Sequence, residues 1–400
     1  MPQDDSRIVR IALVGVGHRA RIFSTINNHS VAGDFGARIV AAADPADAAR
    51  PRAAEWLGAD VPVYRTLDEM LSAGTYDAAI VATPDDVHAD PTVTLLRAGI
   101  PVYLEKPIAT TVFDADRVLQ AAADTGTTLY VGHNMRLMRV ILTMKELIDS
   151  GEIGEVRAIW CRHFVGNGGD YYFKDWHAER AHTTSLLLQK AAHDIDVIHW
   201  LSGGRSTRVV AMGNLSVYNQ VTDHTPLGEA LQHEWIRELR WPPLAQVSIN
   251  PAADVEDLSM MLMELDNGVL ASYQQCHYTP DYWRNYTVIG TAGRIENIGD
   301  GDGAEIRVWN TRTPRYQPRP DRVIPIDEGA EGHVSADIRI LREFLSHLRG
   351  EGDLSSTPLD ARDAVAAGIS ATQSLRNGSI PVLVPEVPSS LSEYFSGSSH

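Results

Sequence analysis

Short apolar runs alternate with helix-like stretches from Arg7 to Tyr130, and this alternation constrains the fold more than any other feature of the sequence. A parallel sheet shows this pattern because its strands are buried on both faces and are connected by crossover helices. The apolar runs predict strands at residues 8–14, 37–43, 78–82, 102–104 and 128–131. We therefore expect the first part of the chain to form an α/β domain around a parallel sheet.

The pattern changes after Gly154, where strand-like stretches joined by Gly or Asn-Gly turns become frequent. They predict a largely antiparallel open sheet with strands at 156–164, 208–218, 258–265, 268–278, 285–290 and 306–309. Helical spacing of apolar residues predicts helices at 186–201, 334–348 and 361–375. We expect an α/β domain over 1–134, a connecting helix over 135–151, an α+β domain for substrate and oligomer contacts over 152–355, and a C-terminal helix and tail over 356–400 that pack back.

The charge balance and the cysteine count exclude several classes of protein. A net charge of −17 argues against a nucleic-acid partner, because neutralising phosphates requires clustered Lys and Arg. No run approaches the roughly 18 apolar residues of a membrane span, and the acidic start does not have the pattern of a signal peptide, so we expect a cytoplasmic protein without a membrane partner. Cys161 and Cys276 form neither a disulfide framework nor a metal signature.

A glycine-rich turn directly follows the first predicted strand, in the segment Gly15-Val16-Gly17-His18-Arg19-Ala20. Its glycines allow the tight turn and the close approach of a pyrophosphate that are typical of a Rossmann dinucleotide-binding domain. Asp44 ends the second strand, where a carboxylate binds the adenosine ribose and repels a 2′-phosphate, which favours NAD over NADP. Arg19 and Arg21 lie beside the phosphate position and leave some room for NADP. The residues predicted to bind the cofactor here are Gly15, Gly17, His18, Arg19 and Asp44.

Two further strand ends point to the same crevice, because ligands bind at the carboxyl ends of parallel strands. They carry Thr83-Pro84-Asp85-Asp86-Val87-His88 and Tyr103-Leu104-Glu105-Lys106-Pro107. With the glycine turn, His193 and Asp196, and Ile289-Gly290-Thr291-Ala292-Gly293, these motifs resemble the Gfo/Idh/MocA family of NAD(P)-dependent sugar and cyclitol oxidoreductases. The Glu-Lys-Pro motif is the specific one, and the resemblance covers nearly the whole chain.

The resemblance implies catalytic roles for Lys106 and His193, and cofactor contacts for Thr83, Pro84, His88, Glu105 and Lys106. A Lys beside a cationic nicotinamide has a lowered pKa, which makes it a better proton acceptor, and Glu105 could hold it in position. Many members carry an Asp four residues before this His, but this chain has Gln189, so Lys190 becomes a second candidate for a base or an anion contact. We also expect Pro107 to fix the turn through a cis bond.

A segment dense in aromatic and cationic residues leads from the first strand of the second domain to His193. Such side chains stack on sugars and hold carboxylate, sulfonate or phosphate groups, which favours an anionic sugar, although they could equally form a solvated loop with internal ion pairs. No pair of its histidines has the spacing of a zinc site, so we expect no metal. The predicted substrate residues are Asn134, Arg162, His163, Lys174, Trp176, His177, Arg180 and Lys190.

Two functions remain open. The first is NAD-dependent oxidation of a ring hydroxyl of a sugar, at C3. The second, implied by relatives that act on glycosides such as sulfoquinovosides, is a hydrolase that oxidises C3, eliminates the aglycone, adds water and returns the hydride. A nucleotide-binding regulator without redox activity is disfavoured by the intact Glu105-Lys106-Pro107. An open sheet has one face to cover, so we expect a homodimer or homotetramer, with residues 221–253 as a long excursion over the second domain or a subunit contact.

Overall fold

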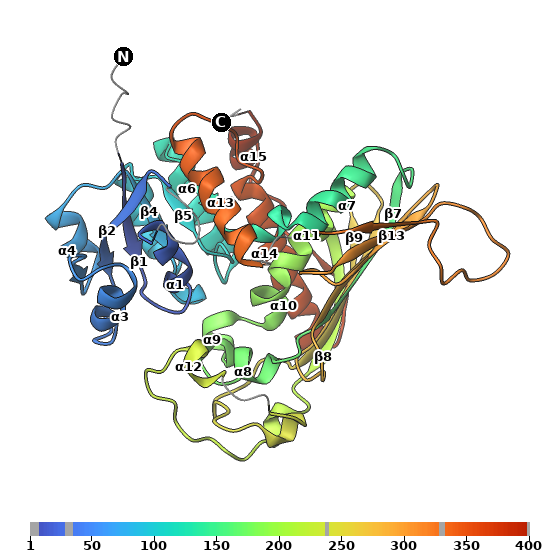
Figure 1. Ribbon diagram of the computed structural model, residues 1–400, viewed down its shortest axis with the longest axis horizontal. Coiled ribbons are helices and arrows are strands. Elements are labelled where there is room, and N and C mark those ends of the chain that lie inside the picture. The colour runs from blue at the N-terminus through green and yellow to red at the C-terminus, as the bar shows by residue number, and fades with distance from the viewer. Residues whose placement is uncertain (1–7, 29–34, 237–239, 328–332, 398–400) are drawn as a thin grey trace.

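A computed structural model describes residues 8–28, 35–236, 240–327 and 333–397. Residues 1–7 of the acidic start and residues 398–400 of the predicted C-terminal tail lie outside these ranges. Two sheets, one in each half of the chain, organise the molecule (Figure 1). No helix within the described ranges is long and apolar enough to cross a membrane.

The first sheet has six parallel strands in the order β3-β2-β1-β4-β5-β6. The strands are β1 (Val9–Val14), β2 (Ala37–Ala43), β3 (Val63–Tyr64), β4 (Ala78–Val81), β5 (Val102–Leu104) and β6 (Leu129–Val131). All residues of β4, β5 and β6 are buried, as expected for strands covered on both faces. The strand order reverses between β1 and β4, which places a crevice at their carboxyl ends. The predicted Rossmann domain is confirmed.

Helices cover both faces of this sheet. They are α1 (Ala20–Phe23), α3 (Ala49–Trp56), α4 (Leu67–Ala73), α5 (Ala89–Arg97), α6 (Val112–Thr125) and, from the C-terminal part of the chain, α13 (His333–Leu348). Although the sequence places α13 within the 152–355 segment, its Ile338, Leu341 and Phe344 pack into the core of the first domain. The short helix α15 (Ser389–Gly397) also returns to this domain, where Leu391 is buried in the core that α6 shares.

The second sheet has nine strands in the order β14-β13-β12-β11-β7-β10-β9-β8-β15, and only the β7–β10 pair is parallel. This confirms the predicted, largely antiparallel sheet. The strands are β7 (Val156–Phe164), β8 (Ser206–Asn214), β9 (Leu258–Leu265), β10 (Leu270–Cys276), β11 (Trp283–Gly290), β12 (Arg294–Ile298), β13 (Glu305–Trp309), β14 (Arg322–Pro325) and β15 (Val382–Leu383).

One face of the second sheet is covered by α7 (Arg139–Asp149), α11 (Ala191–Ser202) and α14 (Pro358–Arg376), and the other face is open (Figure 1). Burial alternates along β9, as it must for a strand with one covered face. The open face carries exposed apolar side chains: Trp160, Met212, Met260, Leu262 and Leu270. Helix α14 packs in both cores, with Val365 in the first and Ala367 in the second, so it joins the two domains.

Two of the predicted elements, one strand and one helix, are shortened or interrupted in the structure. The strand expected over 208–218 ends at Asn214, because the buried Asp257 carboxylate accepts the backbone N–H groups of residues 216, 217 and 218 and turns the chain away. The helix expected over 186–201 is interrupted at Lys190, which separates α10 (Leu186–Gln189) from α11. The short strands β3, β12, β14 and β15 were not predicted.

Candidate active site

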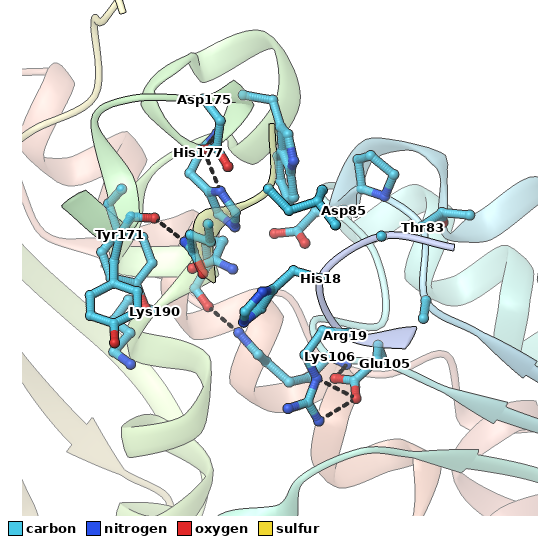
Figure 2. A pocket seen from close by; sticks show the side chains of 18 of the residues that line it. His18, Arg19, Thr83, Asp85, Glu105, Lys106, Tyr171, Asp175, His177 and Lys190 are labelled. Carbon is cyan, nitrogen blue, oxygen red and sulfur yellow. Dashed lines mark hydrogen bonds and ion pairs between the residues drawn. The ribbon is translucent and has the colours of Figure 1, made fainter. Parts of the chain in front are cut away.

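A cavity of about 480 Å³ lies where the carboxyl ends of the first sheet meet α10, α11 and loops of the second domain. Figure 2 shows the side chains around it. The Rossmann domain contributes the glycine turn, the loop after β4 and the Glu105-Lys106 pair after β5. The second domain contributes residues 171–177, the helix break at 189–193 and residues 228–235. The crevice of the parallel sheet is therefore closed into a pocket by the second domain.

The glycine turn is shaped by its contact with the end of β4. Gly15 has φ +93°, and a Cβ there would lie 2.6 Å from the carbonyl oxygen of Ala82, so only glycine fits. A Cβ on Gly17 would meet no protein atom, and this glycine lines the cavity. His18 Nδ1 and Thr83 Oγ1 are buried at the same place, and neither has a hydrogen-bond partner among the described residues. A backbone open to the cavity and unpaired polar atoms fit a dinucleotide.

Asp44 braces this turn from the end of β2. Its carboxylate accepts the backbone N–H groups of Val16 and Ala46, each at 2.8 Å. The Arg19 guanidinium is held elsewhere, since it binds Glu105 with an Nη2–Oε1 distance of 2.6 Å and also binds Asp337 at 3.0 Å. Asp44 thus has acceptor capacity left for ribose hydroxyls, whereas Arg19 is already paired with two carboxylates.

Lys106 extends into the cavity from the end of β5. Its ammonium donates a hydrogen bond to the carbonyl oxygen of Gln189 at 3.1 Å, and the Lys106–Pro107 peptide is cis, as expected. Glu105 was expected to hold this lysine: its Oε2 accepts the backbone N–H of Lys106 at 3.3 Å, while its Oε1 binds Arg19 (Figure 2). Burial lowers the pKa of Lys106, although the nearby Asp85 acts in the opposite direction. A lowered pKa makes this lysine a better proton acceptor than an ordinary lysine.

The break between α10 and α11 brings Lys190 and His193 to the same cavity. Burial and the charge of Arg284 lower the pKa of Lys190 to about 7, and its ammonium lies 5.5 Å from the centre of the Tyr172 ring. Burial and the charges of Lys106 and Lys190 lower the pKa of His193 well below its usual value. His193 is consequently a neutral imidazole at physiological pH, while Lys190 exchanges its proton there.

Asp85 lines the cavity, although it was not among the predicted catalytic, cofactor or substrate residues. Its side chain is 4% exposed, and Oδ2 has no hydrogen-bond partner within the described ranges. Burial raises the pKa of Asp85, and the charges of His88, Lys106 and His177 act against this. A carboxyl group at a strand end, between a Pro and a His, was the signal that could have identified it.

His88 connects the two strand-end loops. Its ring nitrogens contact the carbonyl oxygens of Pro107 at 2.7 Å and Thr83 at 2.9 Å, and the side chain is 1% exposed. The imidazole thus fixes the distance between the loops that carry Thr83 and Lys106 at the edge of the cavity.

The structure brings half of the predicted substrate residues to the cavity, namely Asn134, Trp176, His177 and Lys190. The other four do not line it. Arg162 lies on the open face of the sheet with Asn285, and His163 is in the core beside Asp194. Lys174 is paired with Asp170, and Arg180 with Glu256. The alternative of internal ion pairs therefore describes Lys174 and Arg180 better than a substrate contact does.

Residues 228–235, which we call the strap, cross from the second domain to the Rossmann domain. They lie within the excursion of 221–253 and include α12 (Gln232–Trp235). Arg52 of α3 donates a hydrogen bond to the carbonyl oxygen of Glu229, and the His233 ring stacks on His18 at 5.8 Å. The strap lines the cavity, a role that its aperiodic, Pro-flanked sequence did not reveal.

Comparisons with known proteins identify the family. The profile of the oxidoreductase family with an NAD-binding Rossmann fold, GFO_IDH_MocA, matches residues 9–133, and that of the GFO/IDH/MocA C-terminal domain matches residues 141–296. YteT of Bacillus subtilis is 27% identical over 80% of this chain and 82% of its own length. An inositol 2-dehydrogenase of Rhizobium meliloti is 32% identical over 54% of this chain and 61% of its own length.

One further relative has the name of a hydratase, and one solved structure shows the similarity of the fold. A 2,7-anhydro-N-acetylneuraminate hydratase of Mediterraneibacter gnavus is 31% identical over 52% of this chain and 53% of its own length. The structure of a levoglucosan dehydrogenase with NADH and L-sorbose superposes with a TM-score of 0.76 at 18% identity, covering 95% of this chain and 99% of that one. The two matching profiles, with the glycine turn and the Glu105-Lys106-Pro107 motif at one cavity, establish that this chain is an NAD-binding oxidoreductase of the GFO/IDH/MocA family.

Proposed function

We propose that the protein oxidises a ring hydroxyl, at C3, of a sugar or sugar derivative. The observation that carries the proposal is the position of Lys106, partly buried just after the end of β5, in the cavity that the glycine turn also lines. Alcohol oxidation requires a group that removes the hydroxyl proton, and NAD accepts the hydride from the same carbon when it is bound. Lys106 removes the proton, and the neutral His193 orients the hydroxyl group.

A second candidate is a redox-neutral reaction in which oxidation at C3 is transient. A C3 ketone acidifies the proton on C2, so that a substituent on C1 can be eliminated before water adds and the hydride returns. The specific observation that favours it is a second lysine, Lys190, in the same cavity as Lys106, because simple alcohol oxidation does not need a second amine that titrates near pH 7. The similarity to a hydratase supports the same candidate.

The two candidates are separated by incubating the protein with NAD and a panel of cyclitols, hexoses and aryl glycosides, both neutral and carrying a carboxylate or sulfonate. Absorbance at 340 nm reports NADH, and aglycone release is followed in the same samples. Stoichiometric NADH identifies a dehydrogenase, whereas aglycone release without accumulation of NADH identifies the redox-neutral reaction. A preference for the anionic sugars would support Lys190 as the contact for the acidic group.

Replacing Asp44 with Asn is expected to weaken NAD binding and to raise the affinity for NADP relative to NAD. The carboxylate carries the charge that a 2′-phosphate would meet. Val16 and Ala46 donate to different oxygens of Asp44, so Asn keeps an acceptor for one of these two N–H groups. Titration of the protein fluorescence with each dinucleotide measures both affinities. An unchanged ratio of the two affinities would show that Asp44 does not face the adenosine ribose.

In the redox-neutral reaction, kcat/KM for aglycone release is expected to rise as the pH increases through about 7, because Lys190 takes the C2 proton. The amine accepts a proton only in its neutral form, and with its pKa lowered to about 7 that form becomes populated as the pH increases. In the Lys190→Gln variant the inflection near pH 7 should be absent, because no titrating group remains at this position. Profiles measured from pH 5.5 to 9 on the same substrate test this. An identical inflection in the variant would assign it to another group.

The open face of the second sheet supports a further part of the proposal, association into a homodimer or homotetramer. Its exposed apolar side chains, among them Trp160, Leu262 and Leu270, lie on neighbouring strands β7, β9 and β10. Exposed apolar side chains that gather on neighbouring strands favour a contact with another subunit.

A further inference from the structure

A carboxylate–imidazole pair lines the cavity apart from the two lysines and His193. Figure 2 shows Asp175 and His177 on one side of the cavity, with Lys106 and Glu105 on the other. Asp85 is near both sides, since the charges of Lys106 and His177 both act on its pKa. The oxidation proposed above uses the Lys106 side only. The pair is thus a second acid–base unit that the first half of the reaction does not require.

The geometry fixes the tautomer of His177. The Oδ1 atom of Asp175 accepts the backbone N–H of His177 at 3.1 Å and lies 2.6 Å from its Nδ1, so Nδ1 carries the proton. Trp176 stacks on the imidazole with ring centres 3.7 Å apart, and the edge of Tyr172 contacts it at 5.7 Å. The ring is therefore held on its Nδ1 side and on its faces.

The Nε2 atom of His177 is the free position of this ring. It has no hydrogen-bond partner in the described part of the chain, and the side chain is 15% exposed at the cavity wall. When Nε2 also binds a proton, the Asp175 carboxylate faces the resulting cation and stabilises it. An imidazole supported in this way donates a proton from Nε2 and takes one back.

We infer that His177, positioned by Asp175, protonates the oxygen of a leaving substituent on C1 of the sugar and later removes a proton from the water that adds there. The inference rests on the proposed function and specifies its redox-neutral form. It assigns to this protein a class of substrate, namely sugars with an oxygen-linked substituent next to the acidified carbon. Lys106 then acts on the C3 hydroxyl group, and His177 acts on the substituent at C1 of the same ring.

The step balances as follows. Lys190 takes the C2 proton of the C3 ketone, and the electrons of the C2–H bond form a C1=C2 double bond. The C1–O bond breaks, its electron pair stays on the departing oxygen, and that oxygen takes the proton from His177 Nε2. Water then adds to C1 and gives its proton to Nε2, and C2 regains a proton from Lys190. The C3 ketone finally takes back the hydride and a proton.

The test compares His177→Gln with the wild-type protein on paired phenyl and 4-nitrophenyl glycosides, α- and β-linked, of neutral hexoses, hexuronates and 6-sulfonated hexoses. Phenolate is the poorer leaving group and needs the acid, whereas 4-nitrophenolate departs without it. The variant is expected to lose about 10²–10⁴-fold in aglycone release from the phenyl substrate. It should lose much less on the 4-nitrophenyl substrate, and it should form enzyme-bound NADH in a single turnover at the wild-type rate.

His182→Gln is the matched control, because His182 forms a similar pair with Asp86 at 2.8 Å but does not line the cavity. It should behave as the wild type on both substrates. Asp175→Asn tests the positioning residue: it should change the pH profile for the phenyl substrate and leave that for the 4-nitrophenyl substrate unaltered. A merely structural role would change both profiles alike.

Three results would overturn the inference, and they differ in what they say about the proposed function. Equal losses on both leaving groups would show that His177 is no leaving-group acid, while the oxidation stands. Stoichiometric formation of NADH without aglycone release from any glycoside would refute the inference and identify the protein as a simple dehydrogenase. Neither NADH nor aglycone from the wild-type protein on any substrate would refute the proposed function as well.

Discussion

Replacing Lys106 with Met is expected to lower kcat for NADH formation by about 10²–10⁴-fold while NAD still binds. The substitution removes the group that takes the hydroxyl proton but keeps an apolar stem of similar length at the end of β5. The Gln189 carbonyl loses its hydrogen-bond donor, which the aqueous cavity can replace. Stopped-flow absorbance at 340 nm measures the hydride step, and fluorescence titration measures NAD affinity.

Two further variants separate proton transfer from charge. Lys106→Arg keeps a cation that does not deprotonate near neutral pH, so it should be nearly as inactive as the Met variant. Lys145→Met is the control, because Lys145 pairs with Asp149 on the surface of α7, away from the cavity. It should retain wild-type kcat. Substantial activity in the Arg variant would mean that Lys106 acts through its charge and does not move the proton.

Replacing Asp196 with Asn is expected to lower the free energy of unfolding by about 3–5 kcal/mol. Both carboxylate oxygens bind Arg136, at 2.8 and 2.6 Å, and both side chains are almost fully buried. The pair joins the segment after β6 to the helix α11 that carries His193. Removing this charge leaves the buried guanidinium with the more distant Asp360 carboxylate, at 3.4 Å, as its remaining ion pair within the described residues. Denaturant unfolding measures the loss.

The surface pair between Arg38 and Asp60 is the control for this prediction, since both side chains are more than half exposed. Asp60→Asn should cost less than about 1 kcal/mol. Burial opposes ionisation of Asp196, but Arg136 and His133 outweigh it and hold its pKa well below the usual value. The contribution of Asp196 is therefore complete above about pH 4 and is lost as the pH falls through the lowered pKa. A difference between wild type and variant that grew in acid would contradict this account.

The parts of the fold that the sequence predicted well are those with local causes. Strands β2, β5, β7 and β9 have the predicted bounds, because their apolar content or their alternation is legible within each segment. The end of β8 was missed because it depends on Asp257, which lies about forty residues further along the chain. The local sequence pattern of β8 cannot show that Asp257, the residue before β9, accepts hydrogen bonds from the backbone at this point.

The candidate site shows the same division. Lys106 and Thr83 were predicted because strand ends of a parallel sheet converge. Arg162 and His163 could not both line one pocket, since neighbouring residues of a strand point to opposite faces, and in the structure neither does. Arg180 was misleading for another reason: its partner Glu256 is distant in sequence. The break at Lys190 was hidden by helical spacing that continues across it.

The position of the strap bears on the rate at which a bound dinucleotide would dissociate. It contacts α3 through Arg52 and the glycine turn through His18, over the cavity that those elements share. A dinucleotide bound beneath the strap would dissociate only after these contacts open, which would lengthen its residence time. In the redox-neutral reaction, where the hydride returns to the sugar, one bound nicotinamide would then serve many cycles without a second enzyme to regenerate it, whereas a net oxidation would be limited by the release of NADH.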